Sequence, residues 1–97
     1  MPRLDVRPEA ELDALEAVSW YDGERNGLGL EFLTELRATF ARIEESPQHY
    51  PLVFHECRRA ILRRFPFGVF FIVETGVATV LAITHSHRHP GVWQERI

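Results

Sequence analysis

The chain has 97 residues, of which 45% are hydrophobic and 26% are charged. This balance excludes a disordered protein, and the length allows one small domain, residues 1–97. No apolar run reaches the roughly 18–20 residues of a membrane-spanning helix, and residues 1–5 lack the apolar stretch of a secretory signal. A single cysteine, Cys57, cannot form an internal disulfide. We therefore expect a cytoplasmic protein with no membrane partner.

Charge is distributed unevenly along the chain. Residues 1–56 hold 12 acidic residues and 5 arginines, a net charge of −7, whereas residues 57–97 hold 2 acidic residues and 6 arginines, a net charge of +4. All basic residues are arginines, as codon usage in a GC-rich genome would also give, so only their clustering is informative. That clustering suggests an anionic partner for the second half of the chain.

The first 27 residues predict a short strand followed by a helix. Alternation over residues 3–7 predicts a strand whose Leu4 and Val6 face inward. Pro8 suits the first turn of a helix, and the Asn26-Gly27 stop signal ends that helix between residues 22 and 26. Five residues at helical spacing form its apolar face, with Leu15 at the edge: Ala10, Ala14, Ala17, Val18 and Tyr21.

A single apolar stripe predicts a second helix that ends before Pro47. The stripe, widened by Leu33, consists of Phe32, Leu36, Phe40 and Ile43. Because the connection between the two helices is short and contains glycine, we expect an antiparallel helical hairpin.

The remainder of the chain changes to a strand pattern. Residues 48–56 lack a clean period and contain Pro51, so we expect a loop there. Strands are predicted over residues 57–65, 67–74 and 77 to about 87, with a tight turn at Thr75-Gly76. This order predicts an α+β fold: an N-terminal short strand and an antiparallel helical hairpin packed on a small antiparallel sheet.

Strand parity predicts an arginine cluster on the open face of that sheet. Ala60 and Leu62 suit the helix side, so Arg59 and Arg63 should lie on the opposite face. In the last strand, the face with the larger apolar residues is expected to pack against the helices, and it carries Leu81, Ile83 and His85. Arg88 then lies on the open face with Arg59 and Arg63. Arginine offers planar, bidentate donors, so the cluster suits a phosphate. The alternative is a solvated positive edge that keeps the sheet monomeric.

Several short motifs occur in a fixed order along the chain. They are Trp20-Tyr21, Gly27-Leu28-Gly29, Glu44-Glu45-Ser46-Pro47, the Arg-rich segment Arg58–Phe67 with its Phe65-Pro66-Phe67 turn, and an ending with His85, Arg88, Pro90, Trp93 and Arg96. Together these motifs resemble the RelE/ParE family of bacterial toxins from type II toxin–antitoxin systems, which includes plasmid stabilisation proteins. The Phe-Pro-Phe turn and the ending are more similar to the ParE-like branch.

The resemblance implies a growth-inhibiting toxin that is neutralised by a cognate antitoxin and needs no cofactor. ParE-like members act on DNA gyrase by binding, and this is the function we expect. RelE-like members cut mRNA on the ribosome without metal, which leaves a ribosome-dependent mRNA interferase as the alternative. A non-toxic relic that only binds its antitoxin is a third interpretation. Specific DNA binding by this chain alone is not expected.

In the nuclease interpretation, the arginines would stabilise the charge that develops on the phosphate. Arg59, Arg63 and Arg88 would supply the cations, and His87 or His89 would serve as acid or base.

The chain departs from the RelE pattern at the positions that carry the chemistry. Gly68 stands where RelE-like nucleases place a basic residue after the turn, and Arg59 and Ile61 replace a lysine pair. Trp93 stands in place of a C-terminal tyrosine and has no hydroxyl to donate. An intact RelE-type catalytic set is therefore absent from the sequence, which favours a binding protein and leaves the enzyme question open.

Histidines and the cysteine offer weaker candidates. Alternating His85, His87 and His89 share a strand face, but no fourth ligand is indicated and Pro90 ends the strand, so no metal is expected. His85 is predicted to be a partly buried, structural histidine that holds the end of the strand to the second helix. Neighbouring arginines would lower the pKa of the Cys57 thiol, although a plain structural cysteine is the favoured interpretation.

Two tryptophans remain open between packing and binding. Trp93, which follows the sheet and lies beside arginines, is either exposed as a hot spot for binding the target or packs back on the sheet edge. Trp20 lies off the apolar face of the first helix, so a partner covers it or it is half buried.

Overall fold

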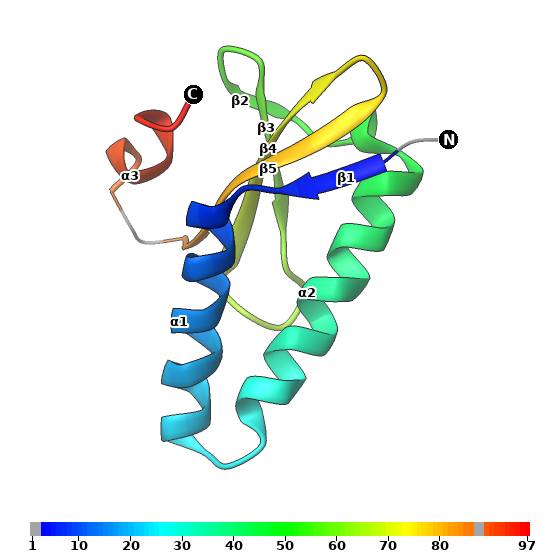
Figure 1. The fold of residues 1–97 in the computed structure, drawn as a ribbon. Coiled ribbons are helices and arrows are strands. Elements are labelled where there is room, and N and C mark those ends of the chain that lie inside the picture. Colours follow the sequence, from blue (N-terminus) through cyan, green and yellow to red (C-terminus); the bar gives the residue numbers. More distant parts are fainter. Residues whose placement is uncertain (1–2, 87–88) are drawn as a thin grey trace.

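The fold is a five-stranded sheet with two long helices on one face (Figure 1). The computed structural model describes residues 3–86 and 89–97. In the spatial order β1-β5-β4-β3-β2, β1 pairs with β5 in parallel and the other neighbours are antiparallel. The predicted α+β fold is thus confirmed, with a sheet that is mixed rather than wholly antiparallel. Its strands are β1 Arg3–Val6, β2 Leu52–Phe54, β3 Cys57–Ile61, β4 Phe67–Glu74 and β5 Val77–His85.

Two helices form the predicted hairpin. Helix α1 spans Pro8–Glu24, with Pro8 in its first turn, and α2 spans Leu28–Glu45. The short η1 helix (Pro47–His49) follows α2, and α3 (Gly91–Gln94) ends the chain. Among the helices of the described residues, none is both long and apolar enough to cross a membrane.

The glycines of the connection have distinct roles. Gly27 adopts a left-handed conformation with φ of 91° directly before α2. Gly29 lies in the first turn of α2, and a Cβ built on it would stand 2.6 Å from the Val18 carbonyl oxygen of α1. The absence of a side chain at Gly29 therefore sets how closely the two helices approach.

The main core lies between the helical hairpin and the sheet. It joins the predicted stripe of α2 to inward residues of β3, β4 and β5, as the parity of Ala60 and Leu62 predicted. An aromatic cluster closes one end, where Tyr21 stacks on Phe32 at 5.4 Å between ring centroids and meets Phe65 edge-on at 4.9 Å. Large, fully buried side chains of this core are Phe32, Leu36, Ile43, Val69, Phe71, Val80 and Ile83.

Strand β5 contains a β-bulge that changes the predicted faces. Phe70 pairs with Ala82 and Phe71 with Val80, so Leu81 is the extra residue. Val80 and Ile83 both reach the main core as a result. The expectation of strict alternation from Leu81 onward is wrong at Leu81, which is buried outside the main core cluster, and correct again at Ile83.

Two other boundaries differ from the sequence prediction. Residues 52–54 form the edge strand β2 inside the expected loop, because they pair with β3 despite their irregular pattern. Strand β3 ends at Ile61 rather than residue 65, since the Leu62 amide donates to the Phe67 carbonyl and starts a turn into β4. The predicted turn at Thr75-Gly76 is present, with φ of 47° and 78°.

Candidate functional site

The open face of the sheet carries a small pocket beside Arg59. The pocket has a volume of about 100 Å³, and its polar lining includes the exposed Arg59 of β3, Thr84 of β5 and Ser86. Its apolar lining includes Phe70 of β4. The guanidinium of Arg59 and the hydroxyls of Thr84 and Ser86 are groups that can donate hydrogen bonds to an anionic group.

Gly68 forms part of this pocket because a side chain there would crowd its walls. A Cβ built on Gly68 would lie 3.1 Å from the Phe70 ring and 3.4 Å from Cγ of Arg59. The glycine thus allows the aromatic ring and the Arg59 stem to approach the strand closely. The departure from the RelE pattern at Gly68 has a packing cause in this chain.

The structure does not bring the predicted arginine cluster together. Arg63 follows the end of β3 and lines a different hollow, of about 440 Å³, with Arg64 and the α2 residues Glu35 and Arg42. Arg59 lines the pocket on the open face instead. The predictions for Arg88 and His87 concern residues that lie outside the described part of the chain.

Trp93 is buried within the chain, so the idea of an exposed hot spot at this position is wrong. Its exposed fraction is 8%, and its indole stacks on the Phe70 ring at 4.3 Å with an interplanar angle of 17°. Phe54 of β2 meets the indole edge-on at 5.9 Å. Helix α3 therefore covers a second, smaller core on the face opposite the hairpin, together with Cys57 and Ala82.

The histidines occupy separate surroundings. His85 is half-buried, as predicted, and its ring lies 5.4 Å from that of Phe67. It also lines a pocket with the α1 residues Glu16 and Trp20. Nδ1 of His89 accepts a hydrogen bond from the Gly91 amide at 3.0 Å. Within residues 3–86 and 89–97, no three metal-ligating side chains gather, and His87 falls outside that range.

Cys57 is a structural residue. The side chain is fully buried, and desolvation raises the pKa of its thiol to about 11. The neighbouring arginines do not produce the low pKa of a reactive cysteine.

An apolar groove of about 400 Å³ separates the two long helices. The helices splay apart from their connecting loop (Figure 1). Leu33 and Phe40 of α2 are only half-buried, whereas the rest of the α2 stripe is buried. Leu33 and Phe40 form one wall, Val18 lies on the other, and the 65% exposed Leu15 stands at the α1 side. Glu11 of α1 and Arg37 of α2 also line the groove. The sequence places these apolar residues correctly, but only the splay of the helices leaves them accessible.

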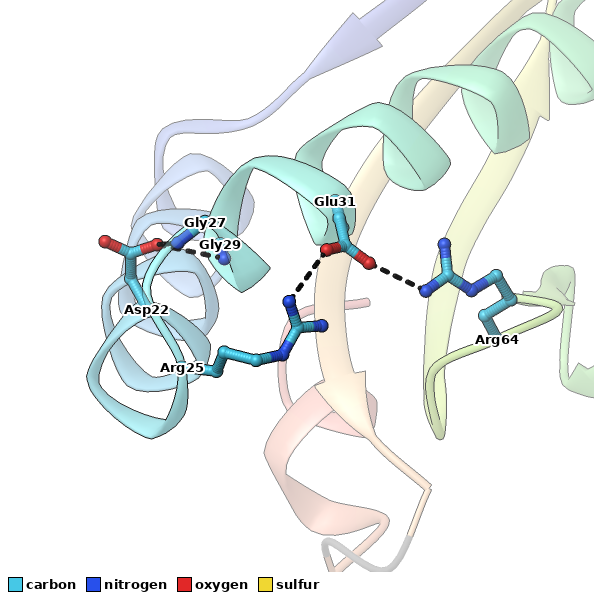
Figure 2. A network of polar contacts seen from close by, with 6 residues as sticks. All are labelled: Asp22, Arg25, Gly27, Gly29, Glu31 and Arg64. Atoms are coloured by element: carbon cyan, nitrogen blue, oxygen red, sulfur yellow. Dashed lines mark hydrogen bonds and ion pairs between the residues drawn. The ribbon is translucent and has the colours of Figure 1, made fainter.

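Two polar networks fix the base of the hairpin and the turn before β4 (Figure 2). Asp22 accepts hydrogen bonds from the amides of Gly27 and Gly29 at 3.0 and 3.2 Å, which satisfies donors at the start of α2. Glu31 pairs with Arg64 at 2.8 Å and with Arg25 at 3.2 Å. The hydrogen bond from Arg64, followed by that from Arg25, lowers the pKa of Glu31. Sequence reasoning missed these contacts because Arg64 lies 33 positions from Glu31 and the other partners meet across the turn between the helices, where helical spacing does not apply.

A buried ion pair binds the edge of β5 along the part of the strand that β1 does not reach. Strand β1 pairs with β5 only up to Val80. Beyond that point the Ile83 amide donates to the Asp13 carboxylate at 3.0 Å, and Arg96 donates to the Leu81 carbonyl at 3.1 Å. Arg96 also donates to Asp13 at 2.6 Å, so the two side chains satisfy each other and the edge of the strand.

A comparison with solved structures identifies the architecture. One solved chain, described as the chromosomal ParDE toxin–antitoxin system from P. aeruginosa, superposes with a TM-score of 0.79 at 18% sequence identity. The match covers 88% of this chain and 96% of that chain. The chain has the RelE/ParE toxin fold. Neither a protein-family model nor a curated protein matches the sequence.

The RelE/ParE fold explains most of the motifs that carry the resemblance. Tyr21 and the turn residues Phe65 and Phe67 form the aromatic cluster of the core. Gly29 permits the helix approach, and Arg96 holds α3 to α1. These motifs therefore contribute to the packing of the fold, and the activity depends on the exposed surfaces.

Proposed function

We propose that this protein is the growth-inhibiting toxin of a bacterial toxin–antitoxin module and acts, in the cytoplasm, in the manner of a ParE-like protein. The structural likeness to the ParDE system over nearly the whole length of both chains carries this proposal. A role in plasmid stabilisation is the biological setting that such modules imply.

The groove between α1 and α2 is the surface that we assign to a cognate antitoxin. It is apolar and lined by Leu33, Phe40 and Val18, as suits a segment that folds when it binds. Such a segment gains affinity by burying apolar side chains, and the acidic first half of the chain favours basic residues around them.

The proposed target is a protein, and DNA gyrase is the candidate that the ParE resemblance implies. Two features support binding over RNA cleavage: Gly68 leaves no basic side chain at its position, and Trp93, which lines the pocket beside Arg59, has no hydroxyl to donate. Arg59 remains available on the open face as a contact for an acidic group of the target.

A ribosome-dependent mRNA interferase is the second candidate, and the pocket beside Arg59 favours it. A hollow of about 100 Å³ with a guanidinium and two hydroxyls suits one phosphate. In that case Arg59 stabilises the developing charge, with Arg88 and His87 as its proposed neighbours. Arg63 lies in another hollow and takes no part at that phosphate.

Two assays on the purified chain separate these functions. In the first, the chain is added to DNA gyrase and relaxed plasmid, and supercoiling is measured. In the second, it is added to ribosomes programmed with mRNA, and cleavage is read by primer extension. We expect inhibited supercoiling and intact mRNA. Cleavage that Arg59→Ala abolishes, with no effect of the chain on gyrase, would establish the interferase instead.

A further inference from the structure

Another pocket lies between α1 and the end of β5, where it shares Ile83 with the groove and His85 with the pocket beside Arg59. Its volume is about 240 Å³, and its walls come from Glu16, Ala17 and Trp20 of α1 together with Ile83 and His85 of β5. Trp20 is 61% exposed, although its ring still meets Tyr21 edge-on at 5.0 Å. An indole face held in place beside a hollow is a surface that attracts a cation.

The charge around this pocket is negative. Helix α1 carries six acidic residues and no basic residue between Pro8 and Glu24. The pKa of Arg96 is raised, mainly by its hydrogen bond to Asp13 and further by the negative charges of Asp13, Glu9 and Glu16. Two of these acidic residues, Asp13 and Glu16, line the pocket together with Trp20.

The chain itself shows which group this side of α1 accepts. Arg96 brings its guanidinium to Asp13, one of the residues that line the pocket, and donates to both carboxylate oxygens at 2.6 and 3.3 Å. Asp13 is thereby satisfied, which leaves Glu16 as the carboxylate and Trp20 as the aromatic face for a second cation.

We propose that the pocket of Glu16, Trp20 and His85 binds an arginine side chain of the antitoxin. The guanidinium lies over the Trp20 indole and donates to the Glu16 carboxylate, while the apolar stem of the arginine contacts Phe67, which also lines the pocket. This inference rests on the proposed toxin function, since it names the partner that supplies the arginine. It assigns a polar, orienting contact to α1, whereas the apolar groove between the helices supplies the area of the interface.

The first experiment tests the pocket without the antitoxin. N-acetyl-arginine amide is titrated into the full chain, and the Trp20 indole N–H and the Ala17 amide are followed by NMR. N-acetyl-citrulline amide, which has the same shape and no charge, is the matched probe. Saturable shifts with the arginine compound alone are expected. Equal shifts with both probes, or none with either, would overturn the inference.

Variants locate the contact. Glu16→Gln and Trp20→Leu should each weaken binding of the arginine probe by about two- to fivefold, as expected for one exposed cation–π or ion-pair contact. Glu24→Gln and Leu12→Ala, at exposed positions of the same helix, should leave it unchanged. Equal losses for all four variants would contradict a specific site.

A second experiment separates this inference from the proposed function. The chain is co-expressed with the product of the adjacent small reading frame, and complex formation is measured by size exclusion and calorimetry. A complex that Glu16→Gln and Trp20→Leu weaken supports both statements. A complex that neither variant weakens overturns the arginine pocket and leaves the toxin function intact. The absence of any complex counts against the proposed toxin function. In that case the arginine titration alone decides whether the pocket binds an arginine side chain.

Discussion

The Arg96 guanidinium donates to the Asp13 carboxylate over 2.6 Å and joins two residues that are 83 positions apart. The Asp13 side chain is 9% exposed and that of Arg96 is 23% exposed, so the pair is largely removed from water. The same two side chains bind the main chain of β5 at Ile83 and Leu81. One contact therefore fastens the first helix, the bulged strand and the C-terminal segment.

Removal of this contact should destabilise the protein strongly. Arg96→Ala leaves the Asp13 carboxylate buried without its cation and should lower the free energy of unfolding by about 2–3 kcal/mol. Arg3→Ala, which removes the exposed Arg3–Asp5 pair, should cost less than about 1 kcal/mol. Urea unfolding followed by circular dichroism measures both. Equal losses for the two variants would show that burial of the Arg96 pair contributes nothing.

Trp93 should be required for stability rather than for target recognition. Its indole fills the small core between α3 and Phe70, so Trp93→Ala should lower the free energy of unfolding by about 3–5 kcal/mol. Ile97→Ala, at an exposed position of the same segment, is the control and should cost little. A Trp93→Ala protein with wild-type thermal stability but no activity would restore the hot-spot interpretation.

The close approach of α1 and α2 should depend on the lack of a side chain at Gly29. Gly29→Ala places a Cβ 2.6 Å from the Val18 carbonyl oxygen and should destabilise the protein by about 1–3 kcal/mol. Gly23→Ala, within α1 and with no atom within 4 Å of its added Cβ, should be neutral or stabilise by up to about 1 kcal/mol. Thermal melting of the two variants should therefore shift in opposite directions, and a parallel shift would contradict this account.

Stability should depend on the ionisation of Glu31. Because its pKa is lowered in the folded protein, the carboxylate contributes stability above its ordinary pKa of 4.5, and this contribution is lost as the pH falls through the lowered value. The difference in unfolding free energy between wild type and Glu31→Gln should thus be largest near neutral pH and shrink below about pH 4.5. In an Arg25→Ala/Arg64→Ala background the pH-dependent part should disappear, and its persistence there would exclude the two ion pairs as its cause.

Local patterns in the sequence predict the parts of the fold that depend on local periodicity. The helix start at Pro8, the α2 stripe and the turn at Thr75-Gly76 all have short-range signals, and the structure contains each of them. Strand β2 lacks such a local signal, because this strand forms through its pairing with β3. The bulge at Leu81 is likewise invisible, since alternation assigns faces only while the pairing register is unbroken.

The candidate site was less predictable because it depends on distant contacts. Parity placed Arg59 correctly on the open face, but Arg63 lies beyond the end of β3, where parity no longer applies. Trp93 packs back onto Phe70 because it lies in a helix of four residues, which is too short to show a periodic pattern in the sequence. The groove between the helices arises from their splay, which the length of the connection does not determine.

Growth of a bacterial culture that expresses the chain from an inducible promoter tests the central claim most directly. Induction of the chain alone should arrest growth, and co-expression of the adjacent small reading frame should restore it. The same rescue should fail for Leu33→Asp if that variant, checked by circular dichroism, stays folded, because a charge in the groove between α1 and α2 would prevent antitoxin binding. Unimpaired growth on induction of the folded wild-type chain would contradict the assignment as a toxin.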